Sequence, residues 1–174
     1  KCDVIGEYYQ FWWRITSGGP VNYHRYPTSI VELDAATGEV HIEETNETVL
    51  GSAGHALELK SKGKYTVNLK VILIEKHQGC YQHLKNVIQT KWKNINIDEA
   101  EKPISENTSN IYLFNLDFNE AIEQVNKIDL GNSLFFFDPL RNVTYQSIEK
   151  VAKGRLITPF KTGTEFMLFI FTSD

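Results

Sequence analysis

The segment Leu69-Lys70-Val71-Ile72-Leu73-Ile74-Glu75 carries the clearest fold signal in the chain. It is a nearly continuous run of branched apolar residues, which is typical of a strand buried on both faces of a parallel sheet. Apolar residues then recur at spacings of three and four from about position 77 to 93, which predicts a helix. A buried strand followed directly by a helix begins a crossover unit. The segment therefore predicts an α/β fold with a parallel sheet.

The same alternation continues on both sides of this segment. Further strands are predicted at 29–34, 111–116, 134–137 and 165–172, and further helices at 55–60, after 117 and around 145–152. The stretches 35–48 and 94–110 are polar and are predicted as a long loop and a surface insertion. We therefore expect a doubly wound, mostly parallel Rossmann-like sheet over 21–174. An aromatic, amphipathic helix within 1–20 is expected to pack on the sheet or to fold over the site as a lid.

Composition limits the classes of function. The 174 residues are 41% hydrophobic and 23% charged, which fits one folded core. A formal net charge of −4 gives no general positive field for a nucleic acid. The longest apolar run, 166–171, is far shorter than the roughly 18 to 20 residues that cross a bilayer. We expect a cytoplasmic protein without a membrane-spanning segment.

The ends of the predicted strands carry acids one after another: Glu32 and Asp34 on the first, Glu75 on the second, Asp117 after the third and Asp138 after the fourth. Parallel sheets of this kind bind ligands at the carboxyl ends of their strands. Glu75 either accepts hydrogen bonds from both hydroxyls of a ribose or caps the following helix. Asp117 either meets the amine of an adenine or caps the following helix, and Asp138 either faces the reacting end of the site or forms an Asp-Pro turn.

The first turn, 35–38, holds a single glycine, Gly38. The glycine-rich fingerprints of dinucleotide and ATP sites are absent, which weakens both ligand classes. A nucleoside without a phosphate chain fits better, and S-adenosylmethionine is such a ligand. Its sulfonium cation tolerates carboxylates and aromatic faces.

Several motifs, in this order, resemble those of the three-Cys-motif partner proteins, which are Rossmann-like methyltransferases that use S-adenosylmethionine. These motifs are Tyr8-Tyr9-Gln10-Phe11-Trp12-Trp13, Val31-Glu32-Leu33-Asp34-Ala35-Ala36-Thr37-Gly38, Gly51-Ser52-Ala53 with Ala56-Leu57, Ile74-Glu75, Asp117-Phe118-Asn119-Glu120 and Leu134-Phe135-Phe136-Phe137-Asp138-Pro139.

The family pattern of the first turn is Asp-x-Phe-Ala-Gly-x-Gly. Glu32 then stands for the acid, Ala35 for the alanine, Ala36 for the first glycine and Gly38 for the last. The resemblance implies that these four residues, with Glu75, Asp117 and Phe118, bind the cofactor. If methyl transfer occurs, Asp138 is the residue expected to orient or deprotonate the acceptor.

Two departures keep alternatives open. Ala36 replaces a glycine, and Leu140-Arg141 follows the Asp-Pro pair where the family has an aromatic residue and a glycine. A non-catalytic partner module that has lost the cofactor is therefore the main alternative, and a different nucleotide enzyme, such as an NAD-type oxidoreductase, is a third. The methyl acceptor stays open between nucleic acid, protein and small molecule.

The predicted strand count sets one further expectation. A methyltransferase sheet of this type has seven strands, and this chain stops after its fifth predicted strand. We therefore expect a domain that is incomplete at its carboxyl end. The free edge of the fifth strand would be exposed, or covered by a partner chain or by self-association.

Overall fold

The computed structural model describes residues 2–17, 27–62, 68–93, 97–99, 111–137, 145–157 and 163–168. Its main sheet is parallel and has six strands in the order β5-β6-β4-β1-β7-β8. Their bounds are β1 (Thr28–Leu33), β4 (Leu69–Ile74), β5 (Ile97–Glu99), β6 (Ile111–Phe114), β7 (Asn132–Phe137) and β8 (Thr164–Leu168).

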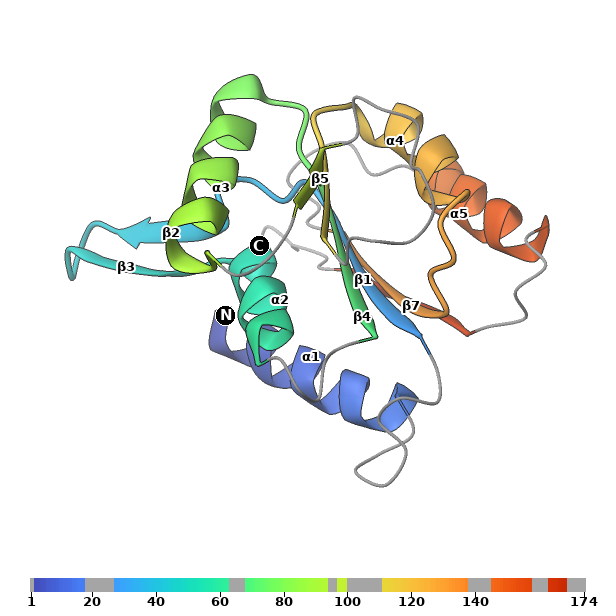
Figure 1. Ribbon diagram of the computed structural model, residues 1–174, viewed down its shortest axis with the longest axis horizontal. Helices are drawn as coiled ribbons and strands as arrows, with labels where there is room; N and C mark the ends of the chain where they lie inside the picture. Colours follow the sequence, from blue (N-terminus) through green and yellow to red (C-terminus); the bar gives the residue numbers. More distant parts are fainter. Residues whose placement is uncertain are drawn as a thin grey trace, which may run out of the picture.

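Helices cover both faces of this sheet (Figure 1). On one face lie α1 (Cys2–Thr16), α2 (Ser52–Ser61) and α3 (Gln78–Lys91), and on the other lie α4 (Phe118–Val125) and α5 (Tyr145–Ile157). From β1 the chain first builds one half of the sheet, through β4 and β6, and then crosses over to β7 on the other side of β1. The fold is therefore the expected Rossmann-like doubly wound fold, and its strand order reverses between β1 and β7.

The core has two parts because successive side chains of each strand point to opposite faces. Ile30, Val71 and Leu73 pack toward α1, α2 and α3, whereas Val31 and Ile72 pack toward α4 and α5. All six residues of β1 are buried. Burial on both faces explains why the central strands are apolar runs rather than alternating patterns.

Each of the five predicted strands corresponds to a strand of the sheet, but two predicted loops are wrong in part. The predicted loop at 35–48 contains most of an antiparallel hairpin formed by β2 (Glu39–Ile42) and β3 (Glu47–Leu50). The predicted insertion at 94–110 contains β5, which pairs with β6 and adds a sixth strand. Both were missed because they are short and rich in polar residues, so their apolar periodicity is weak.

The helix predicted around 145–152 is longer than expected, because Gly154 does not end it. Helix α5 continues to Ile157. A side chain at Gly154 would place its Cβ 2.0 Å from Nδ2 of Asn126, next to α4. Gly154 therefore leaves room for the Asn126 side chain at the end of α4 and does not stop the helix.

Strand β8 is the outermost strand on its side of the described sheet, as expected for the fifth predicted strand. The predicted strand residues 169–172 lie outside the described part. Within the described residues, no helix has both the length and the apolar character that crossing a bilayer requires.

Candidate functional site

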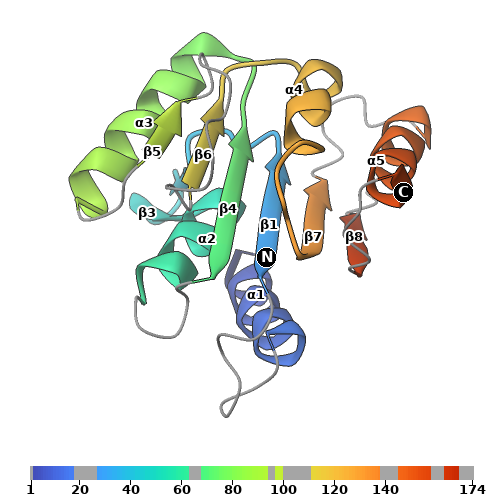
Figure 2. The ribbon, with the colours of Figure 1, turned by 45° about the vertical axis from the view of Figure 1, so that its right-hand side comes forward.

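The carboxyl ends of β1, β4 and β6 lie side by side at one edge of the sheet (Figure 2). The chain leaving β1 lies against the end of β4, since the backbone N–H groups of Asp34 and Ala35 both donate to the carbonyl of Ile74, at 3.1 and 2.9 Å. The N–H of Glu75 donates in turn to the carbonyl of Phe114 at 3.0 Å. Asp34 and Glu75 therefore follow neighbouring strand ends.

The first turn has an unusual backbone. Asp34, Ala36 and Gly38 have φ values of 82°, 50° and 74°, and the first two are not glycines. A left-handed conformation costs an L-residue roughly 1 to 2 kcal/mol. A glycine would adopt the conformation of Ala36 at lower cost. The Ala36 side chain is exposed.

The carboxylate of Glu75 accepts hydrogen bonds from two backbone N–H groups, one of which belongs to the first turn. Its Oε2 accepts from the N–H of Ala36 at 2.9 Å and its Oε1 accepts from the N–H of His77 at 2.6 Å. The residue is only 2% exposed. A carboxylate oxygen has two lone pairs, so each oxygen retains capacity for one further donor. Glu75 thus lies at the end of β4 against the first turn, and each of its carboxylate oxygens accepts from one backbone N–H group.

Glu32 occupies a different environment. It is completely buried on the face covered by α1 and α2, where it accepts hydrogen bonds from the Tyr9 hydroxyl and, at 2.8 Å, from the Ser52 hydroxyl. Burial, together with the negative charge of Glu32, raises the pKa of Tyr9 well above its usual value. Tyr9 therefore keeps its proton and acts as the donor at neutral pH.

The start of α2 returns to the first turn after the β2–β3 hairpin. The N–H of Gly51 donates to the carbonyl of Gly38 at 2.9 Å, and a Cβ added at Gly54 would lie 2.3 Å from the same oxygen. Only a glycine at position 54 allows this approach. An ion pair between Lys91 and Glu39 joins the hairpin to the end of α3.

Asp117 caps α4, as one of its two interpretations predicts: its Oδ1 accepts from the N–H of Asn119 at 3.0 Å. This backbone hydrogen bond is the main reason why the pKa of Asp117 is lowered, and Lys76, 3.4 Å from Oδ2, adds to the effect. The ring of Phe118 packs edge-on against Phe137, with centroids 5.9 Å apart. The cap leaves the side chain of Asp117 43% exposed, so it remains accessible to a ligand.

Of the remaining residues singled out from the sequence, the structure describes the two tryptophans of α1 but not the residues around Asp138. The proposed catalytic Asp138 and its neighbours Leu140 and Arg141 lie outside the described residues. Trp12 and Trp13 are buried in the core between α1 and the sheet, at 3% and 6% exposure.

Three residues whose side chains form hydrogen bonds within the site were not predicted as site residues. Tyr9 and Ser52 anchor Glu32, and the side-chain amide of Asn115 donates to the carbonyls of Glu75 and Lys76 at 2.8 and 3.2 Å. Asn115 directly precedes the Leu-Asp pair before α4, so its position at a strand end was the available signal. Tyr9 and Ser52 lie on separate helices, and no sequence spacing links them to Glu32. Among the residues described, no group of three or more His, Cys, Asp or Glu is arranged to hold a metal ion.

Comparisons with known proteins add little beyond the fold. No family model matches the chain, and no curated protein matches it. A solved structure that matches is a protein from Legionella pneumophila strain Philadelphia 1, described with the family model DUF519. The two are 13% identical with a TM-score of 0.47, and the match covers 88% of this chain and 61% of the other. The chain thus spans less than two thirds of that protein's length, and a likeness of this degree carries no inference about function.

Proposed function

We propose that the chain is an S-adenosylmethionine-dependent methyltransferase that binds adenosine at the carboxyl ends of β1, β4 and β6. The observation that supports this most strongly is Glu75, a buried acid at the end of β4 that accepts a hydrogen bond from the first turn, where Ala36, and Asp34 directly before the turn, have positive φ values. Strained backbone of this kind concentrates at binding sites. The turn also lies next to β1, where the strand order reverses and ligands bind in this fold.

The adenosine is expected to contact three residues. The ribose hydroxyls would donate to the remaining lone pairs of Glu75, which requires the first turn to shift because Glu75 is nearly inaccessible. Asp117 is partly exposed and follows β6, where it would accept from the adenine amine. Phe118 is partly buried at the same strand end and offers an apolar wall.

The start of α2 argues for a ligand without phosphates. In dinucleotide-binding folds the pyrophosphate sits at the N-terminus of the helix that follows the first strand. Here Ser52, the first residue of that helix, donates to the buried carboxylate of Glu32, and Gly51 donates to the turn. A phosphate at this position would meet a negative charge and an occupied N–H group.

Methyl transfer depends more on the alignment of the acceptor with the methyl group than on the strength of an acid or base. When bound, S-adenosylmethionine supplies a methyl group on a positively charged sulfur. The chain's contribution is to hold the adenosine at Glu75 and to align the acceptor with the methyl carbon while excluding water. A base takes the acceptor's proton, the role expected for Asp138 from the sequence.

Isothermal titration calorimetry on the intact chain tests the proposal. We expect binding of S-adenosylmethionine and S-adenosylhomocysteine, and a loss of roughly tenfold or more in affinity in Glu75→Gln, which removes the charge that strengthens hydrogen bonds from hydroxyls. Glu43→Gln is the matched control, because Glu43 is exposed in the hairpin turn. Thermal melts of both variants separate lost binding from lost folding. No heat of binding at about 1 mM ligand would refute the proposal.

The non-catalytic module remains a second candidate, because both oxygens of Glu75 already accept backbone hydrogen bonds and Ala36 occupies a glycine position. The variant Ala36→Gly distinguishes the two. Binding in the wild type supports the methyltransferase. Binding only in Ala36→Gly shows that the natural chain has lost the cofactor and retains the fold for another purpose.

A further inference from the structure

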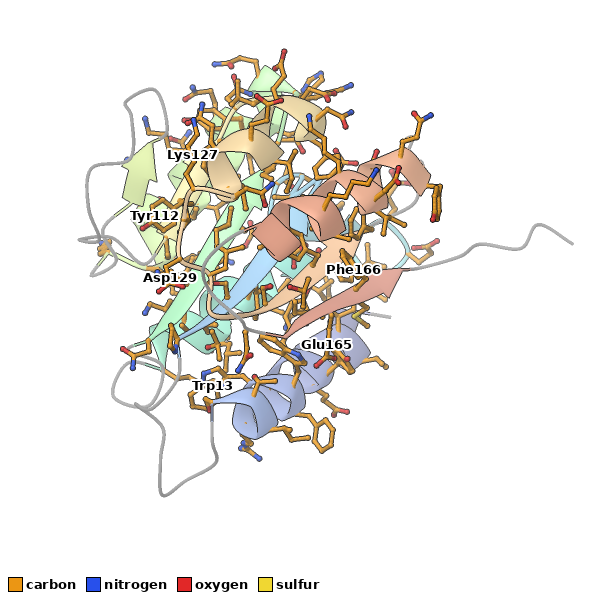
Figure 3. All side chains as sticks on the ribbon, turned by 90° about the vertical axis from the view of Figure 1, so that its right-hand side faces the viewer. Trp13, Tyr112, Lys127, Asp129, Glu165 and Phe166 are labelled. Atoms are coloured by element: carbon orange, nitrogen blue, oxygen red, sulfur yellow. The ribbon has the colours of Figure 1, made fainter. Side chains whose placement is uncertain are left out.

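Helix α1 carries apolar side chains on two separate faces. One face, with Ile5, Tyr9 and Trp12, is buried in the core. On the other face Val4 and Phe11 are both 63% exposed. Figure 3 shows side chains standing out from the outer surface of α1, on the side away from the sheet. A helix that packs only against its own domain does not need the second face.

The second face has the spacing of a helix-pairing seam. Val4, Tyr8, Phe11 and Ile15 are separated by four, three and four residues, so they form one row along the helix. Ile15 is 62% exposed, like Val4 and Phe11, and Tyr8 is partly buried where it meets the core. We call this row the α1 seam.

Two exposed charges flank the α1 seam on one side. Glu7 directly precedes Tyr8 and Arg14 directly precedes Ile15, so the two charges lie seven residues apart along the same edge. If a second α1 ran antiparallel across the seam, Val4 would meet Ile15 of the partner subunit and Tyr8 would meet Phe11 of the partner subunit. Glu7 would then lie near Arg14 of the partner subunit, and two-fold symmetry would form this pair twice.

A parallel arrangement lacks this complementarity. It would bring Glu7 toward the edge that contains Trp12, and Trp12 is buried within its own subunit. The charges also disfavour an anionic membrane, since the exposed charged residues described on α1 are Asp3, Glu7 and Arg14. Both observations favour a second copy of the chain in antiparallel orientation.

We propose that the chain forms a homodimer in which the α1 seams of two copies pack antiparallel, with the two-fold axis passing between Tyr8 and Phe11. The seam exposes only three large apolar side chains strongly, so the dimer is weak, with a dissociation constant of roughly 10 to 100 µM. The proposal does not depend on cofactor binding.

Sedimentation of the intact chain over a concentration series tests the dimer. We expect a concentration-dependent monomer–dimer equilibrium in the wild type, and a monomer throughout for Phe11→Glu. Phe11 is exposed, so the thermal midpoint of this variant should stay close to that of the wild type. A wild type that remains monomeric at about 1 mM, or a Phe11→Glu variant that still dimerises, would overturn the proposal.

Charge reversal tests the orientation of the two helices. Glu7→Arg places arginine at both flanking positions and Arg14→Glu places glutamate at both, so each variant alone should dimerise roughly tenfold more weakly than the wild type. An equal mixture of the two variants should form heterodimers at least as tightly as the wild type dimerises, because each pair of positions 7 and 14 across the interface then joins opposite charges. Glu43→Arg, on the distant hairpin turn, controls for net charge. Failure of the mixture to recover would exclude the antiparallel seam.

Discussion

Replacing Tyr9 with phenylalanine should lower the free energy of unfolding by about 2 to 3 kcal/mol, because it removes a donor from a buried charge. Tyr9 and Glu32 are both completely buried, and the hydroxyls of Tyr9 and Ser52 both donate to the Glu32 carboxylate. Phenylalanine keeps the ring and its edge-on contact with Phe136, 6.1 Å away between centroids. The loss is therefore electrostatic rather than a packing defect.

Tyr8→Phe provides the matched control. Tyr8 is on the same helix, and its hydroxyl reaches Glu165 only at 3.5 Å in an exposed position. Removal of this contact should cost no more than about 0.5 kcal/mol. The two variants thus make the same chemical change at a buried and at an exposed carboxylate.

Chemical denaturation and thermal melts of the wild type and both variants measure the difference. For a chain of this size, 2 to 3 kcal/mol corresponds to a fall of roughly 5 to 10 °C in Tm. The cost of Tyr9→Phe should also fall to about 1 kcal/mol when Glu32 is already glutamine, because a neutral amide loses less than a charge does. Equal costs for Tyr8→Phe and Tyr9→Phe, or no coupling between Tyr9 and Glu32, would refute this account of the buried carboxylate.

Three further changes have defined outcomes. Asp117→Ala removes the α4 cap and should cost about 1 kcal/mol in denaturant titrations, whereas Asp117→Asn should cost much less. Burial lowers the pKa of His55 below its usual 6.5, so the stability that depends on its neutral form is present above pH 6.5 and is lost as the pH falls through the folded-state pKa. Melts between about pH 7.5 and 5.5 should show a smaller loss for His55→Gln than for the wild type. Ala36→Gly removes the strain of a left-handed alanine but increases the entropy of the unfolded chain, so its free energy of unfolding should stay within about 0.5 kcal/mol of the wild type. Ala36→Val should lower the free energy of unfolding by more than about 1 kcal/mol, because a branched side chain adds to the strain.

The sequence alone was sufficient for the fold class. Strands buried on both faces need uninterrupted apolar runs, and helices between them need apolar residues at spacings of three and four, so both appear directly in the order of residues. The acids at the ends of β1 and β4 were visible for the same reason, since each follows or closes an apolar run. The short strands β2, β3 and β5 were not visible, because segments of three or four residues leave little periodic signal.

The tertiary structure decided what those acids do. Glu32 and Glu75 are both acids near the carboxyl end of a predicted strand, yet Glu32 is enclosed with Tyr9 and Ser52, whereas Glu75 accepts a hydrogen bond from the first turn. Glu32 lies within β1, under α1 and α2, whereas Glu75 follows the last residue of β4, so the difference depends on which distant helix or turn packs against each acid. Sequence patterns report local periodicity, whereas a carboxylate's donors come from segments brought together only by folding. The chain order thus determined a parallel sheet with acids at its carboxyl edge, and packing between distant segments assigned each acid its partners.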